Sequence, residues 1–177
     1  CGVTGVLPGN VTPYCSLAGV GNLASNCPYD KSKNDQIVAV FDRTRIITTV
    51  ATGGNGMISI GATGLMPPGS KIFGVMGHEF SHSFGGLPDT WGLTSQSQTN
   101  PTTPICANNS PGFTCQDKWG DLMGVGDGDN KVGCFQGCIF TNWYRPTFAG
   151  DAMHTANAYF YDPVSSRYME NLFKLYK

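Results

Sequence analysis

One short segment restricts what this chain can fold into more than any other: residues 78–89, which read HEFSHSFGGLPD. From Lys71 to about Gly85, apolar residues recur at intervals of three and four, which is the spacing of a helix with one buried face. Two prolines and a glycine interrupt the chain just before this stretch, and Ser70 is a good N-cap. Gly85-Gly86 can supply the left-handed residue that ends a helix. The sequence therefore predicts a helix over about 71–85, followed by a tight turn.

Within the predicted helix, two histidines and a glutamate have the spacing of a metal centre. His78 and His82 are four residues apart, so both imidazole rings project from one helical face and can reach the same ion. Glu79 directly follows the first histidine, where its carboxylate can take a proton from a water that zinc activates. The chain has only three histidines and two glutamates, and three of these five residues lie here. We therefore expect a zinc ion at His78 and His82, with Glu79 as general base.

A third ligand is needed outside the helix, because catalytic zinc usually has three protein ligands and one open position. Asp89 is the favoured candidate, since it lies seven residues after His82, just beyond the Gly85-Gly86 turn. The alternatives are His154 and Glu170, the only other histidine and glutamate. With Glu170 as the third ligand, the chain would belong to another class of zinc protease.

Composition excludes several other classes of protein. The formal net charge is −1 and only 13% of residues are charged, so the chain offers neither a basic nucleic-acid groove nor a polybasic face for a membrane. No apolar run approaches the roughly 18 residues that a bilayer span requires. The 177 residues suffice for one domain with a hydrophobic core, or for two small lobes around a cleft. We expect a monomer whose partner is a protein or peptide substrate.

The cysteines and the start of the chain indicate an oxidising, extracellular environment. None of the seven cysteines forms the CxxC pair that thiolate zinc sites often use, so we expect structural disulfides. The odd count leaves one thiol over, and Cys1 is the first candidate. The chain begins without an initiator methionine or a signal peptide, as the mature form of a secreted protein would. Asn10 and Asn108 lie in glycosylation sequons, which predicts a secreted glycoprotein.

Apolar patterns elsewhere predict an α+β fold, with strands first and helices later. The β-branched runs Gln36 to Phe41 and Ile46 to Ala51 predict two strands, and Met57 to Gly61 predicts a shorter one at a sheet edge. The GGNG sequence at residues 53–56 predicts a turn. Apolar residues at helical intervals between Tyr161 and Lys177 predict a C-terminal helix.

These elements are expected to form a single domain over residues 1–177. Sheet and first helix would make an N-terminal lobe of about residues 1–86. The remainder, about residues 87–177, would make a loop-rich lobe, beginning with a long polar loop over residues 92–118 that contains Cys106 and Cys115.

The pattern HExxHxxGxxxD at residues 78–89 resembles the metzincin zinc endopeptidases, whose third ligand follows a glycine turn. Most metzincins place a histidine three residues after that glycine, where this chain has Pro88 and then Asp89. This departure is similar to the IgA-peptidase-type metzincins, whose motif reads like HEFxHSFGGLxDE beside HEFSHSFGGLPDT here. The resemblance covers about residues 35–175, with further similar blocks at Lys118-Trp119, Val132–Gly137, Tyr144–Thr147 and Phe160–Val164.

The resemblance implies a disulfide-stabilised, metzincin-like catalytic domain: a twisted mixed sheet with an active-site helix and a C-terminal helix. It also implies a Met-turn, a methionine that forms an apolar floor under the zinc ligands. Alignment through the Tyr-Arg-Pro block gives this role to Met153, with Met123 as the alternative. Tyr144 is a candidate for stabilising an oxyanion or contacting substrate, and a buried structural tyrosine is the competing interpretation. The chain departs from residues common in the family at Thr90, Gln136 and Ala152.

The resulting hypothesis is a secreted zinc-dependent endopeptidase in which Glu79 is the general base. An extended substrate would add a strand to a sheet edge, at Met57–Gly61. The alternative is a non-catalytic binding module with a structural zinc site, which would require four protein ligands and leave Glu79 without a role. The GDGDN sequence at residues 126–130 alternates oxygen donors and glycines as calcium loops do. It lacks the closing glutamate, so a polar turn is favoured over a structural calcium site.

Overall fold

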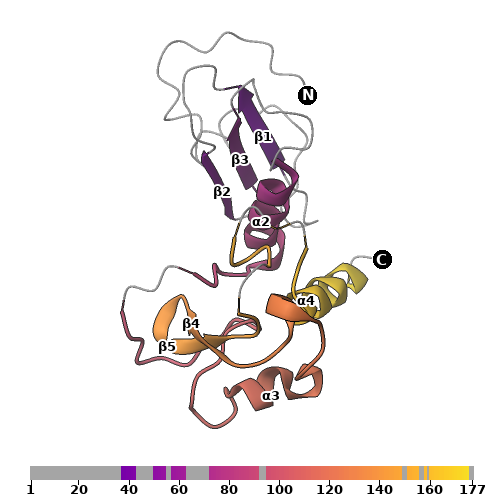
Figure 1. Ribbon diagram of the computed structural model, residues 1–177. Coiled ribbons are helices and arrows are strands. Elements are labelled where there is room, and N and C mark those ends of the chain that lie inside the picture. Colours follow the sequence, from indigo (N-terminus) through magenta and orange to yellow (C-terminus); the bar gives the residue numbers. More distant parts are fainter. Residues whose placement is uncertain are drawn as a thin grey trace. The chain divides into compact units, whose positions relative to one another are not determined.

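A computed structural model describes residues 37–42, 50–54, 57–62, 72–91, 95–148, 151–155, 158 and 160–175. The chain divides into two compact units, Cys1–Phe84 and Gly85–Lys177, whose elements are shown in Figure 1. The predictions for Ser70, Cys1 and Asn10 lie outside the described residues. Among the helices described, none has the length and apolar character that crossing a membrane requires.

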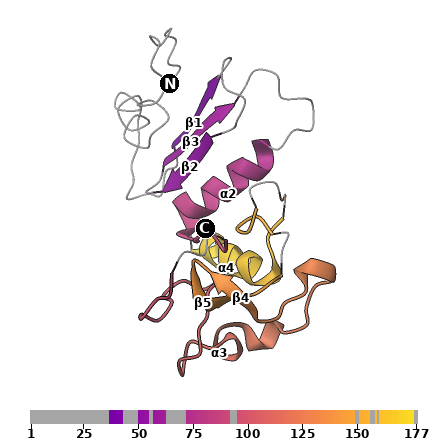
Figure 2. The same cartoon turned by 60° about the vertical axis from the view of Figure 1, so that its left-hand side comes forward.

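The first unit contains a three-stranded mixed sheet. Strands β1 (Ile37–Asp42) and β3 (Met57–Ala62) are parallel, and β2 (Val50–Gly54) is antiparallel to β3. The order is β1-β3-β2, so β3 is the central strand, as Figure 2 shows. The strands predicted over 36–41 and 57–61 are therefore confirmed to within one residue at each end.

Two details of the predicted sheet are wrong. Met57–Gly61 was expected at an edge, but β3 pairs on one side with β1 and on the other with β2. Gly53 and Gly54 were expected in a turn, but they extend β2 opposite Ile58 and Met57. Glycine in a strand costs conformational entropy and side-chain packing, but the ladder hydrogen bonds with β3 override its preference for turns. The pairing leaves two residues, Asn-Gly in sequence, between Gly54 and Met57.

Helix α2 (Ile72–Gly85) confirms the predicted helix and carries the HExxH residues. Phe80 and Phe84 stack on each other, with ring centroids 5.1 Å apart. These phenylalanines are each two residues from a histidine, about 200° around the helix, so they occupy the face opposite His78 and His82. The helix ends where Gly86 adopts φ +60°, the left-handed conformation predicted for this position.

The second unit contains two strands that the sequence did not predict, which corrects the expected order of strands first and helices later. Strands β4 (Phe135–Cys138) and β5 (Phe140–Arg145) form an antiparallel hairpin after the short helix α3 (Cys115–Trp119). Two 3₁₀ turns, η3 (Gly120–Leu122) and η4 (Gly128–Asn130), precede the hairpin. Helix α4 (Pro163–Lys174) confirms the predicted C-terminal helix and is capped by the Asp162 side chain.

Blocks of sequence that are far apart meet in this unit. Trp119 is fully buried and donates its indole N–H to the Gly133 carbonyl at 2.8 Å. Gly133 in turn donates its backbone N–H to the Pro146 carbonyl at 2.7 Å. The guanidinium of Arg145 donates to the carbonyls of Gln136 and Gly137. The Lys-Trp, Val-Gly and Tyr-Arg-Pro blocks therefore form one hydrogen-bonded core.

Four cysteines form the disulfides Cys106–Cys138 and Cys115–Cys134, which confirms the expectation of disulfides for these residues. Asn108 lies in the loop fixed by the first of them. Its amide donates to the Asn100 side chain and its Oδ1 accepts the Ser110 N–H, both at 2.9 Å, and the residue is buried. The Asn108 amide is therefore occupied within the fold, which argues against the glycan predicted there.

Candidate metal centre

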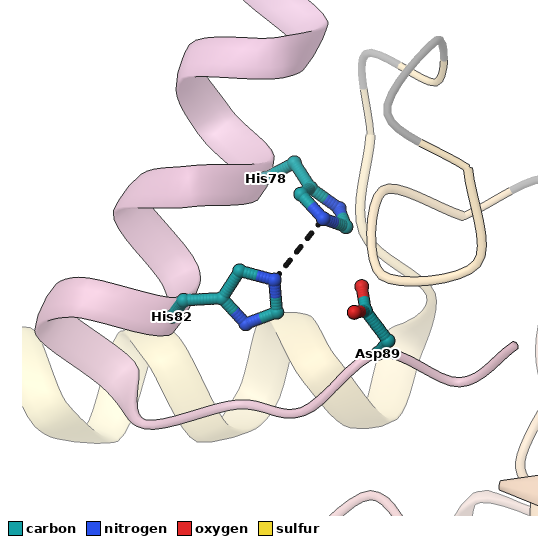
Figure 3. A group of neighbouring side chains, drawn as sticks. All are labelled: His78, His82 and Asp89. Atoms are coloured by element: carbon teal, nitrogen blue, oxygen red, sulfur yellow. Dashed lines mark hydrogen bonds between the residues drawn. The ribbon is translucent and has the colours of Figure 1, made fainter. Parts of the chain in front are cut away.

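The two histidines of α2 face each other across one turn of the helix. Their Nε2 atoms lie 3.1 Å apart, and the ring centroids are separated by 4.6 Å with the ring planes nearly perpendicular (Figure 3). His78 is buried at 5% exposure, whereas His82 is partly exposed. Helical spacing alone places the two side chains on one face, and the rotamers turn both Nε2 atoms toward the same point.

Asp89 reaches the histidines from the segment that follows α2. Figure 3 shows its carboxylate turned toward the two rings. One ligand atom from each of His78, His82 and Asp89 lies within 4.8 Å of the others. The left-handed Gly86 reverses the chain and allows a residue only seven positions after His82 to return to it.

This donor set fits a zinc ion. Imidazole nitrogens and a carboxylate oxygen are the ligands that zinc takes in catalytic sites, at about 2.0–2.2 Å. Two such nitrogens on a tetrahedral ion would lie about 3.3 Å apart. The observed 3.1 Å between the Nε2 atoms is close to that separation. The group formed by His78, His82 and Asp89 could therefore hold a metal ion with little rearrangement.

Neither the alternative ligands nor Glu79, the predicted general base, joins this group. His154 and Glu170 are both described, and neither lies within it; Glu170 is exposed on α4. Glu79 follows His78 on the helix and is buried at 6% exposure, without contributing an atom to the three-residue group. Within the described part of the chain, no other cluster of three or more potential metal ligands occurs.

No protein-family model matches the chain, and no significant match is found among curated proteins. What this site can do is therefore argued from its own donors and from the contacts that hold them.

The segment that carries Asp89 is held at both ends within the second unit. At its start, the Tyr168 hydroxyl of α4 donates to the Gly85 carbonyl at 3.1 Å. At its end, the Thr90 N–H donates to the Met153 carbonyl at 2.9 Å, and Thr90 is buried at 1% exposure. Leu87, between these anchors, is also buried at 1%. Asp89 is thus presented by a short segment with fixed ends.

The two methionines considered for the Met-turn have different surroundings. Met153 is fully buried, and its carbonyl holds the residue next to Asp89. Met123 is 38% exposed beside η3. An apolar floor must be shielded from water, so burial favours Met153 for that role.

Sequence reasoning missed Asp151, which organises the turn around Met153. Its Oδ1 accepts the backbone N–H groups of Met153 at 2.8 Å and His154 at 3.1 Å. Its Oδ2 accepts the Thr147 hydroxyl at 3.0 Å, and Asp151 is buried at 1% exposure. Aspartate two residues before a turn position commonly accepts such bonds, and this pattern in the sequence could have identified it.

Two remaining candidates have structural partners. The Tyr144 hydroxyl on β5 accepts a hydrogen bond from the Asn109 amide at 3.2 Å, which gives this side chain a role in the second unit.

The GDGDN segment forms a turn closed by backbone hydrogen bonds between residues 124–125 and Val132. Asp127 and Asp129 are exposed in it. This agrees with the interpretation of residues 126–130 as a polar turn.

Proposed function

We propose that the chain is a zinc-dependent endopeptidase related to the IgA-peptidase-type metzincins. One observation carries the proposal: His78, His82 and Asp89 converge from a helix and the turn after it, with a buried glutamate next to the first histidine. The motif, the glycine turn and the aspartate ligand of that family are all present in the sequence.

The number of ligands supports a catalytic rather than a structural site. Structural zinc sites are usually closed by four protein ligands, whereas catalytic sites keep one position open. In the described part of the chain, no fourth histidine, cysteine or carboxylate joins the group. A non-catalytic module with a structural zinc would also leave Glu79 buried beside the metal ligands without a function.

A bound zinc ion would polarise the scissile carbonyl and lower the pKa of water toward about 7. Glu79 is placed to accept the proton from the attacking water and to return it to the leaving amine. Burial strengthens this carboxylate's interactions with charge that develops during the reaction, because the surrounding dielectric is low. His78, His82 and Asp89 have no proton-transfer role; they hold the ion.

A peptide substrate would bind in an extended conformation, as an added strand. Because β3 is the central strand, the edges open to such pairing in the described sheet are those of β1 and β2. The sequence predicted that the substrate pairs with Met57–Gly61. We propose instead that it pairs with β1 or β2. Disulfides persist in oxidising compartments, so we propose that the protein acts outside the cell, as a monomer.

Replacing each of the two glutamates tests the proposal. Glu79→Gln should retain one zinc per chain by elemental analysis, because it removes no ligand, and should lower peptide-library cleavage by about 10²–10⁴-fold. Glu170→Gln is the matched control: the same change on exposed α4 should alter neither zinc content nor cleavage. Cleavage by Glu79→Gln at the wild-type rate would overturn the assignment of the general base, and a zinc-loaded wild type without any peptidase activity would overturn the proposed function.

A further inference from the structure

A buried aspartate outside the metal group is linked to the Asp89 ligand by two consecutive hydrogen-bonded contacts. Asp151 accepts the N–H groups of Met153 and His154 and thereby fixes the turn that they form. The backbone carbonyl of the same Met153, which is fully buried, accepts the N–H of Thr90 at 2.9 Å. Thr90 directly follows Asp89, so the geometry of the turn is transmitted to the ligand through one peptide unit.

We propose that Asp151 is a positioning residue of the metal centre, which sets the Met153 carbonyl so that it holds the Asp89 carboxylate at the distance the two imidazoles require. The inference rests on the proposed metal centre, but it does not require that the chain cleave peptides. Asp151 is not part of the three-residue metal group; it acts through Met153 and Thr90.

A positioning residue is needed because of where Asp89 lies in the chain. His78 and His82 are fixed by a helix, whereas Asp89 lies beyond the left-handed Gly86, in a segment without regular structure. Metal sites tolerate errors of only about 0.5 Å in the placement of ligands. Tyr168 anchors the start of the segment and Met153 its end, and the second anchor is adjacent to the ligand. A shift of the Met153 carbonyl would therefore move Asp89 more directly than a change at Gly85.

The chain contains a control for this inference in Asp162, which has the same bonding pattern. Its Oδ1 accepts two backbone N–H groups, those of Val164 at 2.7 Å and Ser165 at 3.0 Å. Its Oδ2 accepts the Ser165 hydroxyl at 2.6 Å, and Asp162 is buried at 1% exposure, like Asp151. This carboxylate caps the first turn of α4, so its hydrogen bonds fix the start of that helix and not the turn around Met153.

Metal affinity of matched alanine variants tests the proposal. Cobalt(II) is titrated into the metal-free full chain and followed by visible absorption, and zinc affinity is then measured by competition. Asp151→Ala should bind both ions about 10–100-fold more weakly than wild type, the usual effect of removing a residue that orients a ligand. Asp162→Ala loses an equivalent set of hydrogen bonds and should bind them within about threefold of wild type.

Asp151→Asn keeps an oxygen for the two N–H groups and should restore near-wild-type affinity and the wild-type cobalt spectrum. Equal losses of affinity in Asp151→Ala and Asp162→Ala would show a purely structural role and overturn the proposal. If Asp151→Ala does not fold, Asp151→Val, which fills more of the buried volume but offers no acceptor, replaces it; wild-type affinity in that variant would also overturn the proposal. A wild type that binds metal without cleaving peptides would contradict only the proposed function.

Discussion

The Nε2 atoms of His78 and His82 lie 3.1 Å apart, a separation at which one nitrogen must donate and the other accept. A metal ion needs both nitrogens unprotonated, so metal binding at this pair weakens as the pH falls.

Zinc should stabilise the folded chain, and the effect should diminish in acid. At a free zinc concentration about 100 times the dissociation constant, the expected gain is about 2.7 kcal/mol, or about 5–10 °C in Tm for a chain of this length. Differential scanning fluorimetry with and without zinc, at pH 7.5 and pH 5, measures it. His82→Ala should abolish the zinc-dependent shift, whereas His154→Ala, which changes the histidine outside the group, should retain it. Equal shifts in the two variants would contradict the metal group described here.

Replacing Gly86 by alanine should weaken both the fold and the metal centre. At φ +60° a Cβ costs about 1–2 kcal/mol, although no atom lies within 4 Å of its position. Gly112→Ala is the matched control, because φ is +80° there and the surroundings are equally open. Chemical denaturation should give similar losses for the two variants, while zinc affinity should fall only for Gly86→Ala. Comparable zinc affinities would show that the turn does not determine the position of Asp89.

The two disulfides should differ in their resistance to reduction. Cys106 and Cys138 are both fully buried, within a cluster that includes Trp143. In the other disulfide, Cys134 is exposed and Cys115 is buried at 5%. Under mild dithiothreitol, alkylation and mass spectrometry should therefore detect labelling of Cys115 and Cys134 first. Prior labelling of Cys106 or Cys138 would contradict the burial described here.

Loss of either disulfide should also destabilise the chain. The bridges span 32 and 19 residues. Closing loops of that size lowers the entropy of the unfolded chain, which stabilises the folded state by about 3–4 kcal/mol for each bridge. Paired Cys→Ala variants in urea denaturation measure this, with the wild type under oxidising conditions as reference.

The parts of the site that follow from local rules could be predicted from the sequence. Helix α2 depends on apolar spacing, and the left-handed Gly86 depends on glycine's conformational freedom. Both can be recognised within one segment of about 15 residues. The central position of β3 and the β4–β5 hairpin depend on pairing between separate segments, which spacing within one segment does not encode. The hydrogen bonds of Asp151 follow a local turn pattern, but its link to Asp89 depends on Met153 lying beside Thr90, which no local pattern encodes.

Asp162 should make the stability of the chain depend on pH between about 4 and 6. Burial, together with the negative charge of Asp151, raises the pKa of Asp162 from its usual value near 3.8 to about 6. The folded state therefore binds this proton more tightly than the unfolded state. Its contribution is fully present below about pH 4 and is lost as the pH rises through 6. The loss amounts to at most about 3 kcal/mol.

Asp162→Asn should remove this contribution while keeping the cap on α4, since Oδ1 can still accept the N–H groups of Val164 and Ser165. The variant should match the wild type near pH 4 and exceed its free energy of unfolding by up to about 3 kcal/mol at pH 7. Urea denaturation of both proteins at pH 4, 5, 6 and 7 measures the difference, in which the titration of other groups largely cancels. A difference that is constant across this range would show that Asp162 does not hold its proton, and that its three hydrogen bonds outweigh its burial.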